Sequence, residues 1–272
     1  MKLYCFNKKY SLHAFFLMSS IGWFASCERV IHIDVGNKEQ KYVVEALITD
    51  AKNSCSVNVS KVTDVYDTTG FRPVSDAVVL IKEDNNLDIP VKLSKAGNYK
   101  ANFSAKPGHH YTLKVNINGV VYTGSSTMPV KVNMDSVYLF NRTIPQIIQK
   151  EINIVFTDPV GLGNTYRITP YVGGKKKKTL YLSDNSTMDG KKVNFVAYIF
   201  DEDDLLEADN NTIRVDMQCI TPFMQQYWYN LLQESRGKNE TASPSNPPSS
   251  FNNGALGYFS TQTTQSKTIS FL

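Results

Sequence analysis

Short runs of alternating apolar and polar residues dominate the first half of the chain. They are rich in β-branched and aromatic residues, and a period of two is typical of strands with one buried face. In chain order the runs are Tyr42–Ile48, Ser54–Val62, Ala77–Lys82, Tyr99–Phe103, Tyr111–Ile117 and Val120–Ser126. Because short strands recur roughly every ten residues, the pattern predicts a β-sandwich. We expect this domain to span residues 41–128.

Turn-forming residues separate these runs. Ala96-Gly97-Asn98 and Lys106-Pro107-Gly108 each lie between predicted strands, and Asn118-Gly119 lies between the last two. The Asn-Gly pair accepts the positive φ angles that a two-residue type I′ turn requires. We therefore predict a tight β-hairpin at Asn118-Gly119.

The strand pattern continues in the second half with a different spacing. The runs there are Ile152–Phe156, Tyr166–Tyr171, Thr179–Leu182, Val193–Phe200 and Thr212–Cys219, and two closing runs follow at Leu256–Ser260 and Lys267–Leu272. Residues 129–272 are therefore predicted to form a second β-rich domain, and the fold class is mainly β.

One main helix interrupts this second domain, at about residues 221–236. Thr221 suits the N-cap position and Pro222 the first helical position. The aromatic side chains around Trp228 are expected to dock the helix on the sheet, and the alternative is that they floor a ligand pocket. A Pro- and Ser-rich loop follows at residues 238–250, and long loops of this kind are candidates for partner contact.

The first residues have the layout of a signal peptide. Lys2, Lys8 and Lys9 precede an apolar segment from Leu12 to Phe24, which is too short to cross a bilayer, since a spanning helix takes roughly 20 residues. The junction Phe24-Ala25-Ser26-Cys27 is similar to a lipobox, with Phe24 where an aliphatic residue is usual. We predict a signal peptide at 1–26, lipidation of Cys27 and a linker at 27–40; the alternative is ordinary secretory cleavage beside a chance cysteine.

Charge argues against nucleic acid as a partner. The formal net charge is +4, and three of these charges leave with the signal peptide, so the remaining chain is close to neutral. Nucleic-acid binding needs a dense basic face. The basic run Lys175–Lys178 is interpreted as a solvated hairpin tip, and attraction to anionic head groups is the alternative.

Two cysteines remain after the signal peptide and Cys27 are set aside. Cys55 and Cys219 are each in phase with the apolar positions of a predicted strand. Both are therefore expected to be buried free thiols, and a disulfide between them is the alternative that an oxidising compartment allows.

The sequence contains no constellation that indicates catalysis. Beyond the signal peptide the histidines are His32, His109 and His110, and adjacent histidines on a strand point to opposite faces. His109 and His110 follow Pro107-Gly108, so a turn is the one setting in which they could share a metal. A nucleophile elbow and a phosphate-binding loop are both absent from the sequence. We expect a protein that is not an enzyme.

An acidic run offers the best candidate for a cation site. Asp201, Asp203 and Asp204 could supply carboxylate oxygens to Ca²⁺. Leu205 and Leu206 occupy positions where a calcium-binding loop needs oxygen ligands and glycine, so a solvated loop is favoured. We accordingly expect no cofactor, with Ca²⁺ as the alternative.

Two short motifs are similar to a bacterial O-glycosylation pattern of Asp, then Ser or Thr, then a small or apolar residue. They place candidate acceptors at Thr68 and Ser136. Intact-mass analysis of protein from the native cell would test both.

Motifs along nearly the whole chain resemble the family called domain of unknown function 4249. They are Lys41–Asp50, Pro73–Val79, Gly97–Tyr99, Gly108–Leu113, Tyr122–Met128, Asp135–Val137, Phe156–Pro159, Asn164–Arg167, Tyr227-Trp228 and Gly254–Ser260. The first half is also similar to small sandwich modules related to transthyretin and carboxypeptidase regulatory domains. This likeness implies an immunoglobulin/transthyretin-like first domain.

The resemblance implies a cellular location and a partner protein. Proteins of this family are envelope lipoproteins, typically encoded beside TonB-dependent outer-membrane transporters. We therefore expect a lipid-anchored outer-membrane protein, on either face, that assists such a transporter in nutrient capture. The alternative is a structural or assembly scaffold of the envelope. The family has no established site residues, so the resemblance assigns none, and the ligand is unknown.

Overall fold

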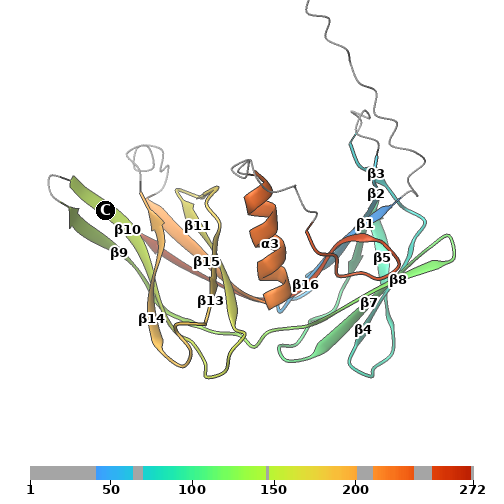
Figure 1. Ribbon diagram of the computed structural model, residues 1–272, viewed down its shortest axis with the longest axis horizontal. Coiled ribbons are helices and arrows are strands. Elements are labelled where there is room, and N and C mark those ends of the chain that lie inside the picture. Colours follow the sequence, from blue (N-terminus) through green and yellow to red (C-terminus); the bar gives the residue numbers. More distant parts are fainter. Residues whose placement is uncertain (1–40, 64–69, 145–146, 201–210, 236–246, 271–272) are drawn as a thin grey trace, which may run out of the picture. The chain divides into compact units, whose positions relative to one another are not determined.

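The alternating sequence pattern produces a structure made mostly of strands. The computed structural model describes residues 41–63, 70–144, 147–200, 211–235 and 247–270 (Figure 1). In chain order the elements are β1 (Tyr42–Thr49), β2 (Cys55–Lys61), β3 (Arg72–Pro73), β4 (Val78–Glu83), β5 (Ile89–Lys95), β6 (Asn98–Ala101), β7 (His110–Ile117), β8 (Val120–Thr127), β9 (Met134–Ile144), β10 (Ile147–Thr157), β11 (Thr165–Val172), β12 (Lys175–Lys176), β13 (Tyr181–Asp184), β14 (Lys192–Ile199), β15 (Thr212–Ile220), α3 (Pro222–Ser235) and β16 (Leu256–Ser270). The predicted mainly β fold, with one helix, is confirmed for the described residues.

Hydrogen bonds join the strands into two sheets. The larger sheet has the order β12-β11-β15-β16-β1-β2-β6-β5-β4-β7-β8, with β13 paired to β11 and β3 paired to β2. The smaller sheet has the order β14-β10-β9. The hairpin predicted between β7 and β8 is confirmed, because Asn118 and Gly119 have φ angles of 51° and 85°, as a type I′ turn requires.

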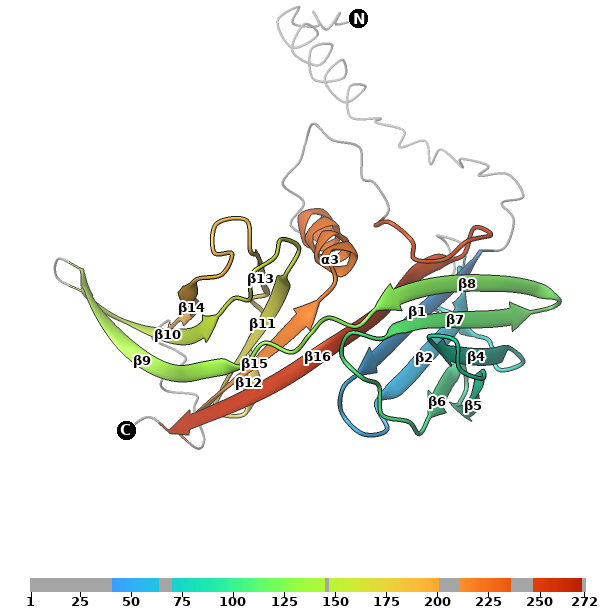
Figure 2. The same ribbon diagram turned by 90° about the horizontal axis from the view of Figure 1, so that it is seen from below.

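Strand β16 pairs with strands from both halves of the chain. Its first part runs parallel to β1, with Val43 opposite Leu256 and Thr49 opposite Gln262. Its second part runs antiparallel to β15, from Thr263 to Ser270. Figure 2 shows β16 (red) continuing from beside β1 to beside β15.

The apolar positions of the strands gather into two hydrophobic cores. The first core contains side chains of β1, β2, β4, β6 and β7, and it also takes in Phe251, Ala255 and Phe259 from near the end of the sequence. The second core lies among β9, β10, β11, β14 and β15, with Ile154 and Tyr166 fully buried. The first core is consistent with the sandwich that the alternating pattern predicts for the first half of the chain, and the second core with a second β-rich part.

The two cysteines lie in different cores. Cys55 belongs to the first core and Cys219 to the second, and both thiols are buried and free. Their predicted inward orientation is confirmed. Burial raises the pKa of Cys55 to about 12 and also raises the pKa of Cys219, so both groups are protonated at neutral pH.

Helix α3 begins as its sequence predicts. The Thr221 hydroxyl accepts a hydrogen bond from the main-chain N–H of Met224 at 3.3 Å, which caps the first turn. Met224 is buried, while Tyr229 is 56% exposed, so the helix presents one face to the protein. Among the described residues, no helix is long and apolar enough to cross a membrane.

Several elements differ from the sequence-based expectation. Strands β5 and β9 were not predicted, and the two closing runs are parts of one strand, β16. The polar residues between those runs remain extended because Thr261 and Gln262 pair with β1, and Thr263–Ser266 pair with β15. The lysine run does not form a hairpin tip: Gly173-Gly174 makes the turn, and Lys175 and Lys176 form β12 beside β11.

Candidate functional site

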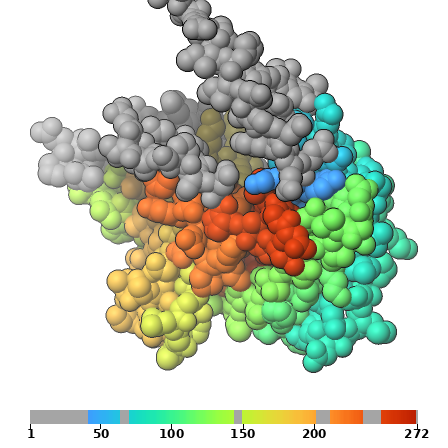
Figure 3. Space-filling model, turned by 45° about the vertical axis from the view of Figure 1, so that its right-hand side comes forward, coloured from blue at the N-terminus to red at the C-terminus, as the bar shows by residue number. Residues whose placement is uncertain are grey.

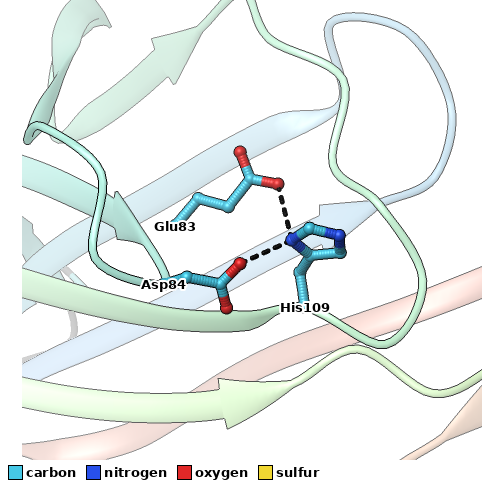
Figure 4. A group of neighbouring side chains, drawn as sticks. All are labelled: Glu83, Asp84 and His109. Atoms are coloured by element: carbon cyan, nitrogen blue, oxygen red, sulfur yellow. Dashed lines mark hydrogen bonds and ion pairs between the residues drawn. The ribbon is translucent and has the colours of Figure 1, made fainter.

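Two carboxylates converge on one histidine nitrogen at the end of strand β4. The Nδ1 atom of His109 lies 2.5 Å from Oδ2 of Asp84 and 3.2 Å from Oε1 of Glu83 (Figure 4). Glu83 ends β4 and Asp84 begins the following turn, whereas His109 directly precedes β7. Antiparallel pairing of β4 with β7 brings these positions together. We call Glu83, Asp84 and His109 the carboxylate–histidine cluster.

Lys106 and Tyr111 contact the buried carboxylate of Glu83. Its side chain is only 10% exposed. The Lys106 ammonium lies 3.3 Å from Oε1, and the Tyr111 hydroxyl donates to the same oxygen at 3.3 Å. Burial, together with this carboxylate, raises the pKa of Tyr111 to about 12, so the hydroxyl keeps its proton.

The carboxylate–histidine cluster is held together by the contacts of His109 Nδ1 with Asp84 and Glu83. His109, Asp84 and Glu83 offer ligand atoms that all lie within 4.8 Å of one another, the donor set that a divalent metal ion uses. However, ligand atoms bound to one zinc ion lie roughly 3.3 Å apart, given bonds of about 2.0–2.2 Å. The 2.5 Å contact is that of an Nδ1–H donating to a carboxylate, so a metal ion would have to displace this proton.

Asp84 makes the stability of the protein depend on acidity. The His110 main-chain N–H donates to Oδ1 of Asp84 at 2.9 Å, and this bond, with His109, holds the pKa of Asp84 below its usual value. The unfolded chain therefore binds a proton more readily than the folded one. The stabilisation is present above the unfolded pKa, near 4, and is lost as the pH falls through the lower folded pKa.

We expect Asp84→Asn to remove part of this acid sensitivity. Between about pH 4 and pH 2, the unfolding free energy of the wild type should fall more steeply than that of the variant. Urea denaturation followed by circular dichroism at several pH values measures both slopes. Equal slopes would show that Asp84 is not a source of the acid dependence.

A cavity of about 530 Å³ lies beside strand β8. It is lined chiefly by Ser125–Val130, Leu162–Tyr166 and Cys219–Phe223, with Gly108, Val132 and Phe259. None of the lining residues carries a charge. The volume falls within the range of about 300–1,000 Å³ that ligand sites occupy. We call this space the β8 cavity.

Two exposed apolar side chains project from the loop between β10 and β11. Val160 is 87% exposed and Leu162 is 80% exposed, and Leu162 lines the β8 cavity. The loop is held by side-chain bonds, because Asn185 accepts from the Gly163 N–H at 3.0 Å and Asp189 accepts from the Gly161 N–H at 2.7 Å. A fixed loop that exposes apolar side chains is typical of a contact surface.

The aromatic residues of α3 dock the helix on the sheet. Tyr227 and Trp228 both contact Tyr258, with ring centroids 5.1 Å and 6.1 Å apart. Figure 3 shows the orange part of the surface, which includes α3, beside the red part formed by residues near the end of the sequence. The Arg167 guanidinium lies 5.0 Å from the Trp228 ring and donates through Nε to Gln218 at 2.6 Å. Burial lowers the pKa of Arg167.

The structure brings together few of the residues singled out from the sequence. Ser136 is exposed on β9, where a modifying enzyme could reach it, and its glycosylation stays a prediction. Cys27, Thr68 and the acidic residues Asp201, Asp203 and Asp204 lie outside the described residues.

Sequence reasoning missed Glu83, Asp84 and Leu162. Nothing in the sequence singles out the first two, because the pairing of β4 with β7 that brings them to His109 is a long-range feature. The glycines at 161 and 163 are the signal that could have singled out Leu162, since they flank an apolar residue in a loop.

Comparisons with known proteins place the chain in a family without giving it a function. No curated protein matches it. A solved structure described as "Cytokine receptor complex - Crystal form 1A" is similar over 84% of this chain and 95% of its own, with 10% sequence identity and a TM-score of 0.29, and this likeness is too distant to inform function. A family model described as domain of unknown function (DUF4249) matches residues 28–268. The chain therefore belongs to the DUF4249 family.

Proposed function

We propose that this protein is a non-enzymatic accessory lipoprotein of the outer membrane, which binds a TonB-dependent transporter and assists it in nutrient capture. The observation that carries the binding role is the β8 cavity. Its lining offers apolar contacts and neutral polar groups and contains no Asp, Glu, Lys, Arg or His. Burial raises the pKa of Cys219 and the pKa of Tyr166, the two lining residues that can titrate, so both stay protonated. Such a lining suits recognition, because acid–base chemistry needs groups that titrate near neutral pH within reach of the bound molecule.

His110, whose ring contacts the cavity residue Thr127, supports the same interpretation. The His110 ring lies close to the cavity, with Nδ1 3.0 Å from Oγ1 of Thr127. Asp84 accepts from the main chain of His110, so it does not orient that ring as the acid of a catalytic triad does. This arrangement favours a structural role for His110.

The membrane location rests on the signal peptide and on Cys27. Acylation at a lipobox supplies at least two chains, which is enough for stable anchoring. An exposed contact loop on an anchored protein could meet an integral membrane partner, and Val160 and Leu162 provide such a loop.

A pull-down from native membranes tests this function. The tagged protein would be isolated in a gentle detergent, and its companions identified by mass spectrometry. We expect a TonB-dependent transporter at a stoichiometric level. The matched control is Cys27→Ala, which should leave the membrane fraction and lose the transporter.

Two other results of the pull-down would contradict the accessory role. Absence of any transporter, combined with uptake that is unchanged in a strain lacking the gene, would refute the accessory role. A set of envelope assembly proteins in its place would favour the scaffold function instead.

A further inference from the structure

In the described part of the chain, strand β8 is the last strand of the larger sheet, so one of its edges has no neighbouring strand in the sheet order. In an antiparallel pair, alternate residues direct their main-chain N–H and C=O groups toward the partner strand. The N–H of Met128 donates to the His109 carbonyl at 3.0 Å, and this bond sets the phase of the β7–β8 pair. Thr123, Ser125 and Thr127 therefore direct their main-chain groups away from β7, toward the edge of the sheet.

The chain itself covers the first half of this edge. The Asn252 N–H donates to the Thr123 carbonyl at 3.2 Å, and the Asn252 side chain accepts from the Thr123 N–H at 2.7 Å. Phe251 bridges Gly124, with its ring against the glycine: a Cβ at position 124 would lie 2.9 Å from that ring. This segment shows how an apolar side chain and an extended main chain fit together on β8.

No described residue covers the second half of the edge in this way. The chain turns away at Ser250, whose N–H donates to the Gly257 carbonyl at 3.2 Å, and Pro247 and Pro248 have no N–H to donate. Within the described ranges, the outward main-chain groups of Ser125 and Thr127 have no hydrogen-bond partner, and both residues are exposed. An open strand edge of this kind is a template for another strand.

The open part of the edge borders the β8 cavity. Ser125 and Thr127 both line it, and Leu162 and Val130, which is 67% exposed, also line it. The absence of charge in the lining decides what the cavity accepts, because a charged group would lose its hydration there without gaining an oppositely charged partner. An uncharged apolar group matches the lining.

We propose that an extended segment of the partner protein adds to β8 at Ser125 and Thr127 and places an uncharged apolar side chain in the β8 cavity. This inference rests on the proposed function, because it defines how the partner binds. Main-chain hydrogen bonds supply affinity in this mode of recognition, and the pocket for one side chain supplies specificity. The segment continues the cover that Phe251 and Asn252 begin.

Two variants with matched controls isolate the two parts of the contact. Ser125→Pro removes the outward N–H, and an edge strand tolerates proline where the N–H faces solvent; Ser125→Ala keeps the N–H. Leu162→Asp places a charge at the rim of the cavity. Val160→Asp is its control, because Val160 is similarly exposed in the same loop (87% against 80% for Leu162) but is not among the residues that line the cavity.

The probe is a phage-displayed library of random peptides about 12 residues long, selected on the full-length protein. We expect selected peptides to alternate apolar and polar residues, as a strand does. Ser125→Pro and Leu162→Asp should each weaken binding of the best peptide at least about tenfold, whereas the two controls should stay within about twofold. Peptides that bind all four variants equally, or a selection that enriches none, would overturn the proposal.

The uncharged dye N-phenylnaphthylamine tests the rival occupant, a small apolar molecule. Dye binding that Leu162→Asp abolishes and Ser125→Pro leaves intact, without any peptide binding, would assign the cavity to a small molecule and overturn strand addition.

The same variants separate this proposal from the accessory function. If a transporter co-purifies with the wild type and equally with Ser125→Pro and Leu162→Asp, the function stands and strand addition at β8 fails. If selected peptides bind at β8 but no transporter co-purifies, strand addition stands and the accessory function fails.

Discussion

Replacing Gly257 with alanine is expected to destabilise the protein by about 3–5 kcal/mol. Gly257 has a φ of +106°, and a Cβ there would lie 2.1 Å from the Val44 carbonyl oxygen and 2.8 Å from its carbonyl carbon. The obstacle is backbone in a parallel strand pair, so it cannot be relieved by turning a side chain. The main chains of β1 and β16 would have to move apart. This would also disturb the first core, which contains Val44 of β1 and Phe259 of β16.

The matched control for this substitution is Gly254→Ala. Gly254 also has a positive φ, +78°, but a Cβ there meets nothing within 4 Å. Gly254→Ala should therefore lower the free energy of unfolding only through backbone strain, by about 1–2 kcal/mol. Urea denaturation of both variants measures the difference. Equal destabilisation would mean that close approach of the two strands is not what requires glycine at position 257.

Replacing Asp158 with alanine is expected to destabilise the protein by about 3 kcal/mol, the second-largest effect. Asp158 is 1% exposed and accepts hydrogen bonds from the Tyr166 hydroxyl and, at 3.0 Å, from the Asn185 amide. Burial and the nearby carboxylate raise the pKa of Tyr166, so its hydroxyl stays a donor. Removing the carboxylate leaves the buried Tyr166 hydroxyl without its acceptor, which is costly. It also removes one acceptor of the Asn185 amide, which still donates to the Gly161 carbonyl at 2.7 Å.

Asp189→Ala is the control for Asp158→Ala. Asp189 holds the same loop through the Gly161 N–H, but that bond lies at the surface, so we expect a loss of about 1 kcal/mol. Thermal unfolding followed by circular dichroism compares the two variants. An Asp158→Ala protein as stable as Asp189→Ala would show that the buried network contributes little. Because Asn185 also accepts from Gly163, Asp158→Ala should loosen the loop that carries Leu162.

Local chemistry explains which parts of the fold could be predicted from the sequence. The Asn118-Gly119 hairpin, the cap of α3 at Thr221 and the inward orientation of Cys55 each depend on residues close together in the chain. Propensity and periodicity report such features directly.

Long-range pairing explains the parts that could not be predicted. The run Thr261–Ser266 is polar, and nothing within it indicates that Thr261 and Thr263 are buried. It is part of a strand because Thr261 and Gln262 pair with β1, whereas Thr263–Ser266 pair with β15. Hydropathy alone therefore predicts two short strands where the structure has the single strand β16.

The candidate site was less predictable than the fold for the same reason. His109 was recognised as a residue that needs a turn to act, but its partners come from the end of β4. The β8 cavity combines three segments far apart in sequence, and the open edge at Ser125 depends on where Phe251 stops. Such features follow from tertiary structure and have no local signature.

The parallel pairing of β1 with β16 also determines the order in which the protein can be completed during synthesis. Residue 44 leaves the ribosome long before residue 257, its neighbour in the sheet. Until then the nascent first sandwich lacks Phe259 from its core, and β1 keeps one open edge that could pair with another chain. Contacts so distant in sequence also slow folding. A chain of this design therefore stays incompletely folded until translation is nearly finished.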